Sequence, residues 1–109
     1  MKYEVLTIPP FDRQMKRLSK KYPSLKAKYS TLIEELEENP EKGIPMSNNC
    51  FKIRLAIASK GRGKSGGARV ITHCYIENKT VFLLAIYDKS EQDDISDKEL
   101  IELLSEIEK

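Results

Sequence analysis

Phe51-Lys52-Ile53-Arg54-Leu55-Ala56-Ile57 is the stretch of sequence that decides the fold, because the spacing of apolar residues changes there from helical to strand-like. Its larger apolar side chains alternate with Lys52, Arg54 and Ala56, which predicts a strand with one basic face. Two further apolar, β-rich runs follow at 68–76 and 80–87, and the turn between them contains Asn78-Lys79, which indicates a hairpin. The second half of the chain therefore supplies three strands.

The first half of the chain carries helical spacing instead. A weakly alternating run over 1–8, ended by Pro9-Pro10, predicts a first strand. Apolar residues then recur every three or four positions over 11–22, which predicts a helix. A second helix is expected from a cap at Ser24 to the residues before Asn39-Pro40. The short turn between the two predicts an antiparallel helical hairpin.

A last helix is expected near the C-terminus. The capping box Ser96-Asp97-Lys98-Glu99 opens it, and its apolar face follows from Leu100 to Ile107. The predicted order of elements is thus β-α-α-β-β-β-α. A length of 109 residues, 39% hydrophobic and 33% charged, predicts one compact domain over 1–109.

The composition disfavours several classes of protein. No apolar run approaches the roughly 18 residues that cross a bilayer, and the N-terminus has no apolar signal core, so a cytoplasmic location is expected. Cys50 and Cys74 follow no metal or redox spacing and are expected to be reduced and partly buried. His73 is the only histidine, which excludes a ribonuclease mechanism that needs a pair of them.

Charge is segregated along the chain although its net value is only +2. Residues 51–76 carry six cations and no acid, whereas residues 88–109 carry nine acids against three lysines. An unrelieved basic block indicates an anionic partner that binds there, with a merely solubilising surface as the alternative. Within this block, the segment 59–67 holds four glycines together with Lys60, Arg62 and Lys64.

This glycine-rich segment predicts a loop that grips a nucleic-acid backbone, because such contacts are mostly lysine and arginine to phosphate. It lacks the spacing of a nucleotide-binding P-loop and leads into a strand rather than a helix, which excludes that kind of site. A plain flexible loop remains the alternative reading.

The strands themselves predict a second group of cations. Lys52 and Arg54 share a strand face, and Arg69 opens the next strand, so pairing of these strands would bring three cations together. Like charges there would depress the pKa of a lysine and suit it as a general base, while arginine suits a phosphorane transition state. Tyr87 and Lys89 end the last strand on one common face and could stack on a base and contact phosphate.

Together these residues resemble the RelE/ParE toxin superfamily. The resemblance covers nearly the whole chain, is strongest over 51–91, and is closest to the HigB-type branch through the sequence Gly63-Lys64-Ser65-Gly66-Gly67. It implies a small α+β domain with an antiparallel-rich, four-stranded sheet packed on an N-terminal helical hairpin, and a C-terminal helix. It also implies a type II toxin that cuts mRNA in the ribosomal A site through 2′-hydroxyl attack, with no metal or other cofactor. The implied partners are the ribosome, mRNA and a cognate antitoxin, expected to be a helix-turn-helix protein from an adjacent gene.

The resemblance also implies roles for single residues. Lys52 and Arg54 match a lysine base and a phosphate ligand, and Arg69 matches the arginine that stabilises the transition state. The loop cations Lys60, Arg62 and Lys64 match residues that face ribosomal RNA or the substrate backbone. Tyr87 and Lys89 match the end of the last strand and are nominated for the leaving-group proton, because the arginine and later tyrosine that some members carry are absent from 89–95.

Two other functions fit the same fold. One is a ParE-like inhibitor that binds DNA gyrase and cuts nothing, and the other is a degenerate toxin kept as a binding module. The clustered strand cations favour RNA chemistry over both. Arg69 is expected to be exposed, so an Arg69→Ala variant should lose toxicity and keep its fold.

Overall fold

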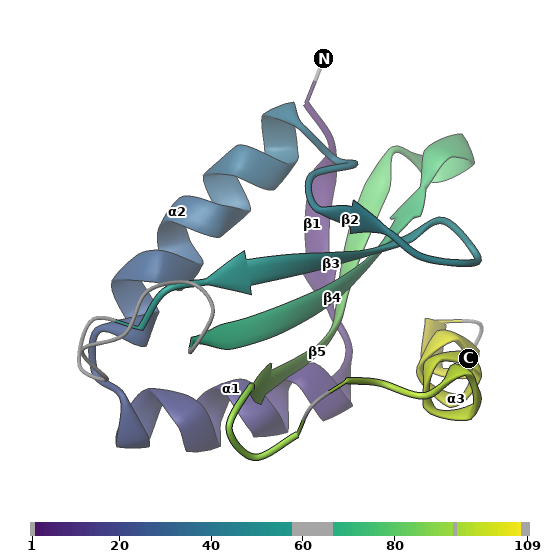
Figure 1. Cartoon of the computed structure of the whole chain (residues 1–109). Helices are drawn as coiled ribbons and strands as arrows, with labels where there is room; N and C mark the ends of the chain where they lie inside the picture. The colour runs from purple at the N-terminus through teal and green to yellow at the C-terminus, as the bar shows by residue number, and fades with distance from the viewer. Residues whose placement is uncertain (1, 58–66, 93, 108–109) are drawn as a thin grey trace.

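The computed structural model describes residues 2–57, 67–92 and 94–107, which form three α-helices, one short 3₁₀ helix and a single sheet (Figure 1). The elements in chain order are β1 (Glu4–Thr7), α1 (Pro9–Lys21), α2 (Leu25–Glu38), β2 (Ile44–Pro45), β3 (Cys50–Leu55), β4 (Ala68–Tyr75), η3 (Ile76–Asn78), β5 (Thr80–Asp88) and α3 (Asp97–Ile107). The predicted α+β class and all seven predicted elements are confirmed.

The sheet has five strands in the order β1-β5-β4-β3-β2, so the prediction of four strands was wrong by one. The additional strand, β2, has only two residues, one of them proline, and so shows no alternation that a sequence could reveal. β1 pairs with β5 in parallel, while β2, β3, β4 and β5 pair antiparallel in succession. The sheet is therefore mixed, with β5 in its interior although it is the last strand along the chain.

The two faces of the sheet differ in what they carry. One row of paired residues, Leu55, Ala68 and Asp88, points to the helical hairpin, since the Asp88 carboxylate reaches Tyr22 at the end of α1. We call this the helical face. The adjacent row points the opposite way, because successive side chains in a strand alternate. We call that side the open face.

The residues at their N-terminal ends help to set where α1 and α2 begin. α1 begins with Pro9 and Pro10 at its first two positions, where a missing N–H costs nothing, and it packs along β5. α2 contacts β1, and both helices bury leucines in the core. Ser24 is the N-cap residue of α2, as predicted, but its side chain forms no capping hydrogen bond.

The C-terminal helix α3 starts at the predicted capping box. The Glu99 N–H donates to Ser96 Oγ at 3.1 Å, and the Ser96 N–H donates to Glu99 Oε1 at 3.3 Å. α3 contacts β5, and its Leu100 side chain is buried, with only 1% of the residue exposed. None of the described helices is long and apolar enough to cross a membrane.

Candidate nucleic-acid interface

A row of three functional candidates crosses the open face. Arg54 of β3 pairs with Arg69 of β4, and Arg69 pairs with Tyr87 of β5. Directly paired residues project on the same side of a sheet, so these three side chains share the open face. Lys52 lies two residues before Arg54 and projects on that face too. The predicted pairing of the two strands is confirmed, and it places the cations Lys52, Arg54 and Arg69 on one face of the sheet.

The members of this row differ in exposure. Arg54 is exposed and Lys52 is half-buried, whereas only 5% of Arg69 is exposed. The expectation that Arg69 is exposed was wrong, because on the inner strand β4 its side chain is flanked by those of Arg54 on β3 and Tyr87 on β5. Its Nη1 donates to the Ala68 carbonyl oxygen at 3.2 Å. Tyr87 is also buried, which leaves no open ring face for a base to stack on in this conformation.

An acidic residue that the sequence reasoning did not assign lies beside Lys52. The Asp94 Oδ1 is 3.3 Å from Lys52 Nζ, so the acidic C-terminal region folds back onto the basic face. The N–H of Ile95 and then the Lys52 ammonium hold the pKa of the Asp94 carboxyl below its ordinary value. The predicted crowding of like charges around Lys52 is thus relieved on one side. The segregation of acids into 88–109 was the signal that could have suggested this contact.

Lys89 follows β5 immediately and is half-buried. Its N–H donates to the Gly67 carbonyl oxygen at 3.1 Å, which ties the end of β5 to the residue that precedes β4. The loop cations Lys60, Arg62 and Lys64 lie outside the described residues.

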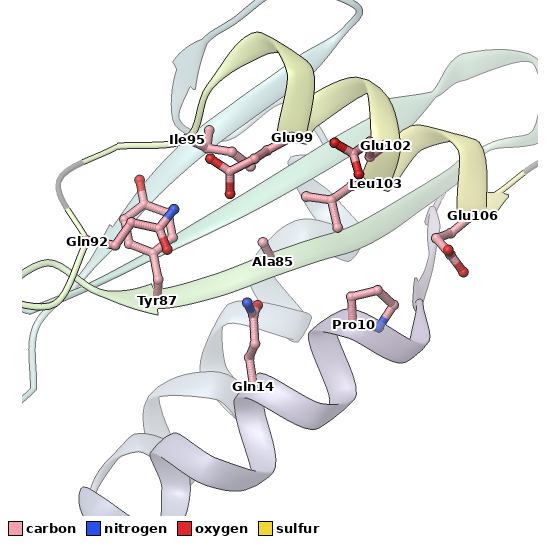
Figure 2. Close-up of a pocket in the computed structure, with 10 residues that line it drawn as sticks. All are labelled: Pro10, Gln14, Ala85, Tyr87, Gln92, Ile95, Glu99, Glu102, Leu103 and Glu106. Atoms are coloured by element: carbon pink, nitrogen blue, oxygen red, sulfur yellow. The ribbon is translucent and has the colours of Figure 1, made fainter.

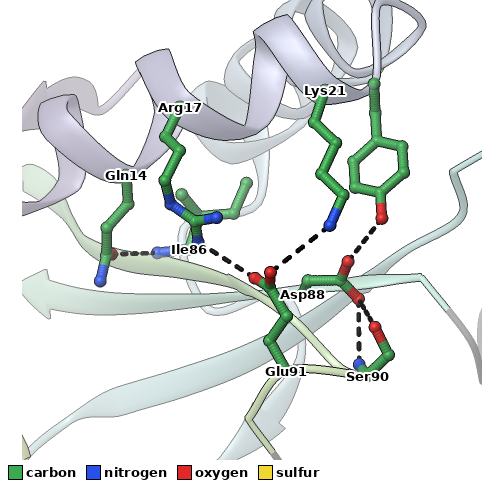
Figure 3. A network of polar contacts seen from close by, with 8 residues as sticks. Gln14, Arg17, Lys21, Ile86, Asp88, Ser90 and Glu91 are labelled. Atoms are coloured by element: carbon green, nitrogen blue, oxygen red, sulfur yellow. Dashed lines mark hydrogen bonds and ion pairs between the residues drawn. The ribbon is translucent and has the colours of Figure 1, made fainter.

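Asp88 organises the turn that follows β5 (Figure 3). Its carboxylate is completely buried and accepts the Tyr22 hydroxyl at 2.7 Å, the Ser90 N–H at 2.9 Å and the Ser90 hydroxyl at 2.8 Å. Its backbone carbonyl oxygen accepts two further N–H groups, from Glu91 and Gln92. Burying a carboxylate is costly unless it is hydrogen-bonded, so these contacts explain why an acid can lie here.

The same turn is fastened to α1 at its surface. Glu91 lies 3.1 Å from Arg17 and 3.4 Å from Lys21, two cations one helical turn apart (Figure 3). The hydrogen bond from Arg17 is the main reason that the pKa of the Glu91 carboxyl is lowered. Tyr87 and Lys89 flank Asp88 in sequence. The contacts of Asp88 and Glu91 with the α1 region therefore hold the backbone at these two candidate residues in place.

A pocket of about 270 Å³ lies between α1, β5 and α3 (Figure 2). Gln14 of α1 closes one side, where its Oε1 accepts the Ile86 N–H at 3.0 Å beyond the end of the β1–β5 pairing. α3 contributes Glu99, Glu102 and Glu106 to the lining. Three carboxylates make this pocket unfavourable for a phosphate backbone.

The cysteines do not supply a nucleophile. Both are free and buried, as expected, and burial raises the pKa of the Cys50 thiol to about 11. Cys50 Sγ lies 3.7 Å from His73 Nδ1, and burial lowers the pKa of that imidazole. No group of three histidine, cysteine or acidic side chains within the described ranges could hold a metal ion.

Comparison with known proteins gives a family and a fold. The family model described as "RelE toxin of RelE / RelB toxin-antitoxin system" matches residues 12–108. The free E. coli toxin RelE, as a mutant with two arginines replaced by alanine, is 19% identical, with a TM-score of 0.60 and coverage of 97% of this chain and 94% of that one. The RelBE2 toxin–antitoxin complex of Mycobacterium tuberculosis is 15% identical, with a TM-score of 0.56 and coverage of 81% and 92%. Isolated E. coli RelE is 20% identical, with a TM-score of 0.55 and coverage of 96% and 98%. Assignment to a HigB-type branch stays a prediction.

Proposed function

Since the chain belongs to the RelE toxin family of toxin–antitoxin systems, we propose that it inhibits translation by cutting mRNA in the ribosomal A site. The observation that carries this proposal is the row Arg54–Arg69 on the open face, with Lys52 two residues away on the same side. Cations placed this closely on one face suit a phosphodiester with two arginine ligands and a lysine beside the attacking oxygen.

In the proposed reaction, Lys52 takes the proton from a 2′-hydroxyl. The 2′-oxygen then bonds to the adjacent phosphorus, and the bond from phosphorus to the 5′-oxygen breaks. Arg54 binds the phosphate, and Arg69 neutralises the charge that develops on its oxygens. The products are a 2′,3′-cyclic phosphate and a 5′-hydroxyl. We assign the proton on the leaving 5′-oxygen to Lys89 or Tyr87, and the reaction needs no metal.

Before RNA binds, the Asp94 carboxylate forms an ion pair with Lys52. In this ion pair 60% of the Asp94 side chain is exposed but only 23% of the Lys52 side chain, and water around the acid weakens the pair. A phosphate that arrives against the exposed Arg54 can therefore replace it. The loop cations Lys60, Arg62 and Lys64 are proposed to hold the RNA backbone outside this centre.

The proposal includes a partner that keeps the toxin inactive. The M. tuberculosis neighbour was solved as a toxin–antitoxin complex, which supports a cognate antitoxin for this chain. We propose that this antitoxin is a helix-turn-helix protein encoded next to the toxin gene. Its binding would cover the open face or block entry to the ribosome.

The test is cleavage of an mRNA, both naked and on programmed ribosomes, with the 5′ ends mapped. Arg54→Ala is the loss-of-function variant, because Arg54 is exposed and its removal leaves the core intact. Lys28→Ala removes an exposed cation from α2 and serves as the matched control. We expect codon-phased cuts on the ribosome by the parent and the control, and none by Arg54→Ala. Gyrase inhibition by a protein that cuts no RNA would replace the proposal with the ParE-like function.

A further inference from the structure

A second basic hollow lies at the edge of the sheet where β2 pairs with β3. It has a volume of about 340 Å³ and is lined by Lys42, Gly43, Ile44, Lys52, Ile53 and Arg54. Lys52 and Arg54 belong to the candidate catalytic row, while Lys42 comes from the segment between α2 and β2. Three cations therefore surround one hollow, and the candidate catalytic centre accounts for only two of them.

The backbone explains why the hollow exists. β2 pairs through only two residues, Ile44 with Lys52 and Pro45 with Phe51, and the preceding chain crosses close to β3. Gly43 has a φ of +111°, and a Cβ built on it would lie 2.6 Å from the Lys52 carbonyl oxygen. Only glycine permits this approach, which holds Lys42 beside the edge of β3.

The charges around the hollow favour an anion. The Lys42 ammonium is 3.3 Å from Glu35, whose side chain is 46% exposed, and Lys52 is 3.3 Å from Asp94, whose side chain is 60% exposed. The lysines are less exposed, with 34% of the Lys42 side chain and 23% of the Lys52 side chain accessible, but water around the two acids weakens both ion pairs. Within the described part of the chain, Arg54 forms no ion pair. An anion placed between the three cations would meet Arg54, which has no acidic partner among the described residues, and two lysines whose acidic partners are solvent-exposed.

The position of the hollow relative to the catalytic row indicates which anion. Neighbouring strands lie about 4.8 Å apart, and Arg69 is one strand away from Arg54 on the side opposite to the hollow. A phosphate between Arg54 and Arg69 and a second phosphate between Arg54 and Lys42 would thus lie side by side across β3.

We propose that this hollow is a binding subsite for an RNA phosphate other than the scissile one, with Lys42 as its distinguishing ligand. The inference rests on the proposed function for the identity of the polymer. The phosphate belongs either to the substrate strand or to ribosomal RNA, and Lys42 acts in binding rather than in the chemical step.

The experiment compares Lys42→Ala with Lys28→Ala, an exposed lysine on α2 that lies outside the hollow. Binding is measured by fluorescence anisotropy with a 2′-O-methyl RNA, which cannot be cleaved, over a series of salt concentrations. We expect Lys42→Ala to weaken binding by about fivefold and to reduce the slope of log Kd against log salt by about 0.7, the loss of one single-strand phosphate contact. Lys42→Arg should restore both values, since it keeps the charge.

Cleavage kinetics separate the subsite from the reaction. We expect Lys42→Ala to raise KM and leave kcat unchanged, because a phosphate bound equally in the ground and transition states affects binding only. A deficit on naked RNA assigns the phosphate to the substrate strand, and a deficit confined to ribosomes assigns it to ribosomal RNA. Equal behaviour of Lys42→Ala and Lys28→Ala in both assays overturns the subsite, as does a loss confined to kcat. A parent protein that binds RNA through Lys42 but cuts none would overturn the proposed function and leave the subsite standing.

Discussion

Removing one oxygen atom, in the variant Tyr22→Phe, tests whether the buried Asp88 fastens the end of β5 to α1. The Tyr22 hydroxyl donates to Asp88 Oδ2 at 2.7 Å, and the carboxylate is completely buried. A hydrogen bond to a charged group contributes about 1.5–3 kcal/mol, so we expect the free energy of unfolding to fall by about 2 kcal/mol. The ring remains, and with it the contact to Lys21, whose ammonium lies 5.4 Å from the ring centroid.

The assay is urea unfolding at neutral pH. With an m-value of about 2 kcal/mol/M, a loss of that size lowers the midpoint by about 1 M and leaves the slope unchanged. Tyr29→Phe is the matched control, since no hydrogen bond from the Tyr29 hydroxyl is found among the described residues. A double-mutant cycle with Asp88→Asn should give a coupling of at least about 1 kcal/mol. Equal midpoints for Tyr22→Phe and Tyr29→Phe would refute the reasoning.

Three further outcomes are expected. Asp94→Asn should tighten binding of a 2′-O-methyl RNA by about threefold in fluorescence anisotropy, because it frees Lys52 from its ion pair; weaker binding would show that the acid does not compete. Burial lowers the pKa of His73, so the unfolded chain takes up that proton first as pH falls below 6.5; the urea midpoint should decline between about pH 7 and 5, and a His73→Gln variant that declines equally would contradict this. Arg69→Ala should lower the free energy of unfolding by about 1–3 kcal/mol and Arg54→Ala by less than about 0.5, since only Arg69 is buried; thermal melts that coincide would show that burial does not matter here.

Local patterns in the sequence were enough to predict most of the fold. The alternation from Phe51 to Ile57 and the capping box at Ser96 each depend on neighbours a few residues apart, and both were confirmed. β2 was missed because two residues, one a proline, carry no period. The Ser24 side chain was expected to cap α2 from its residue type alone, and residue type does not determine which donors it reaches.

The sequence could predict which cations lie together in the candidate site, but not how buried they are or which acids they contact. The sequence predicted that Arg54 and Arg69 would lie together if their two strands paired, and the strands do pair. The burial of Arg69 depends on the side chains that flank it on β3 and β5, which no local pattern around Arg69 contains. The contact between Lys52 and Asp94 joins residues 42 positions apart, so only the opposite charges of the two regions hinted at it.

The place of β5 has a consequence for protein synthesis. The strand made last lies between β1 and β4, and it supplies the parallel partner of β1 more than seventy residues earlier in the chain. Contacts of such long sequence separation are slow to form, because closing the intervening loop costs entropy. A chain released from the ribosome before Thr80 would have no strand to pair with β1 and would lack both Tyr87 and Lys89. If the full-length protein halts translation as proposed, copies that end before Thr80 lack part of the machinery for doing so.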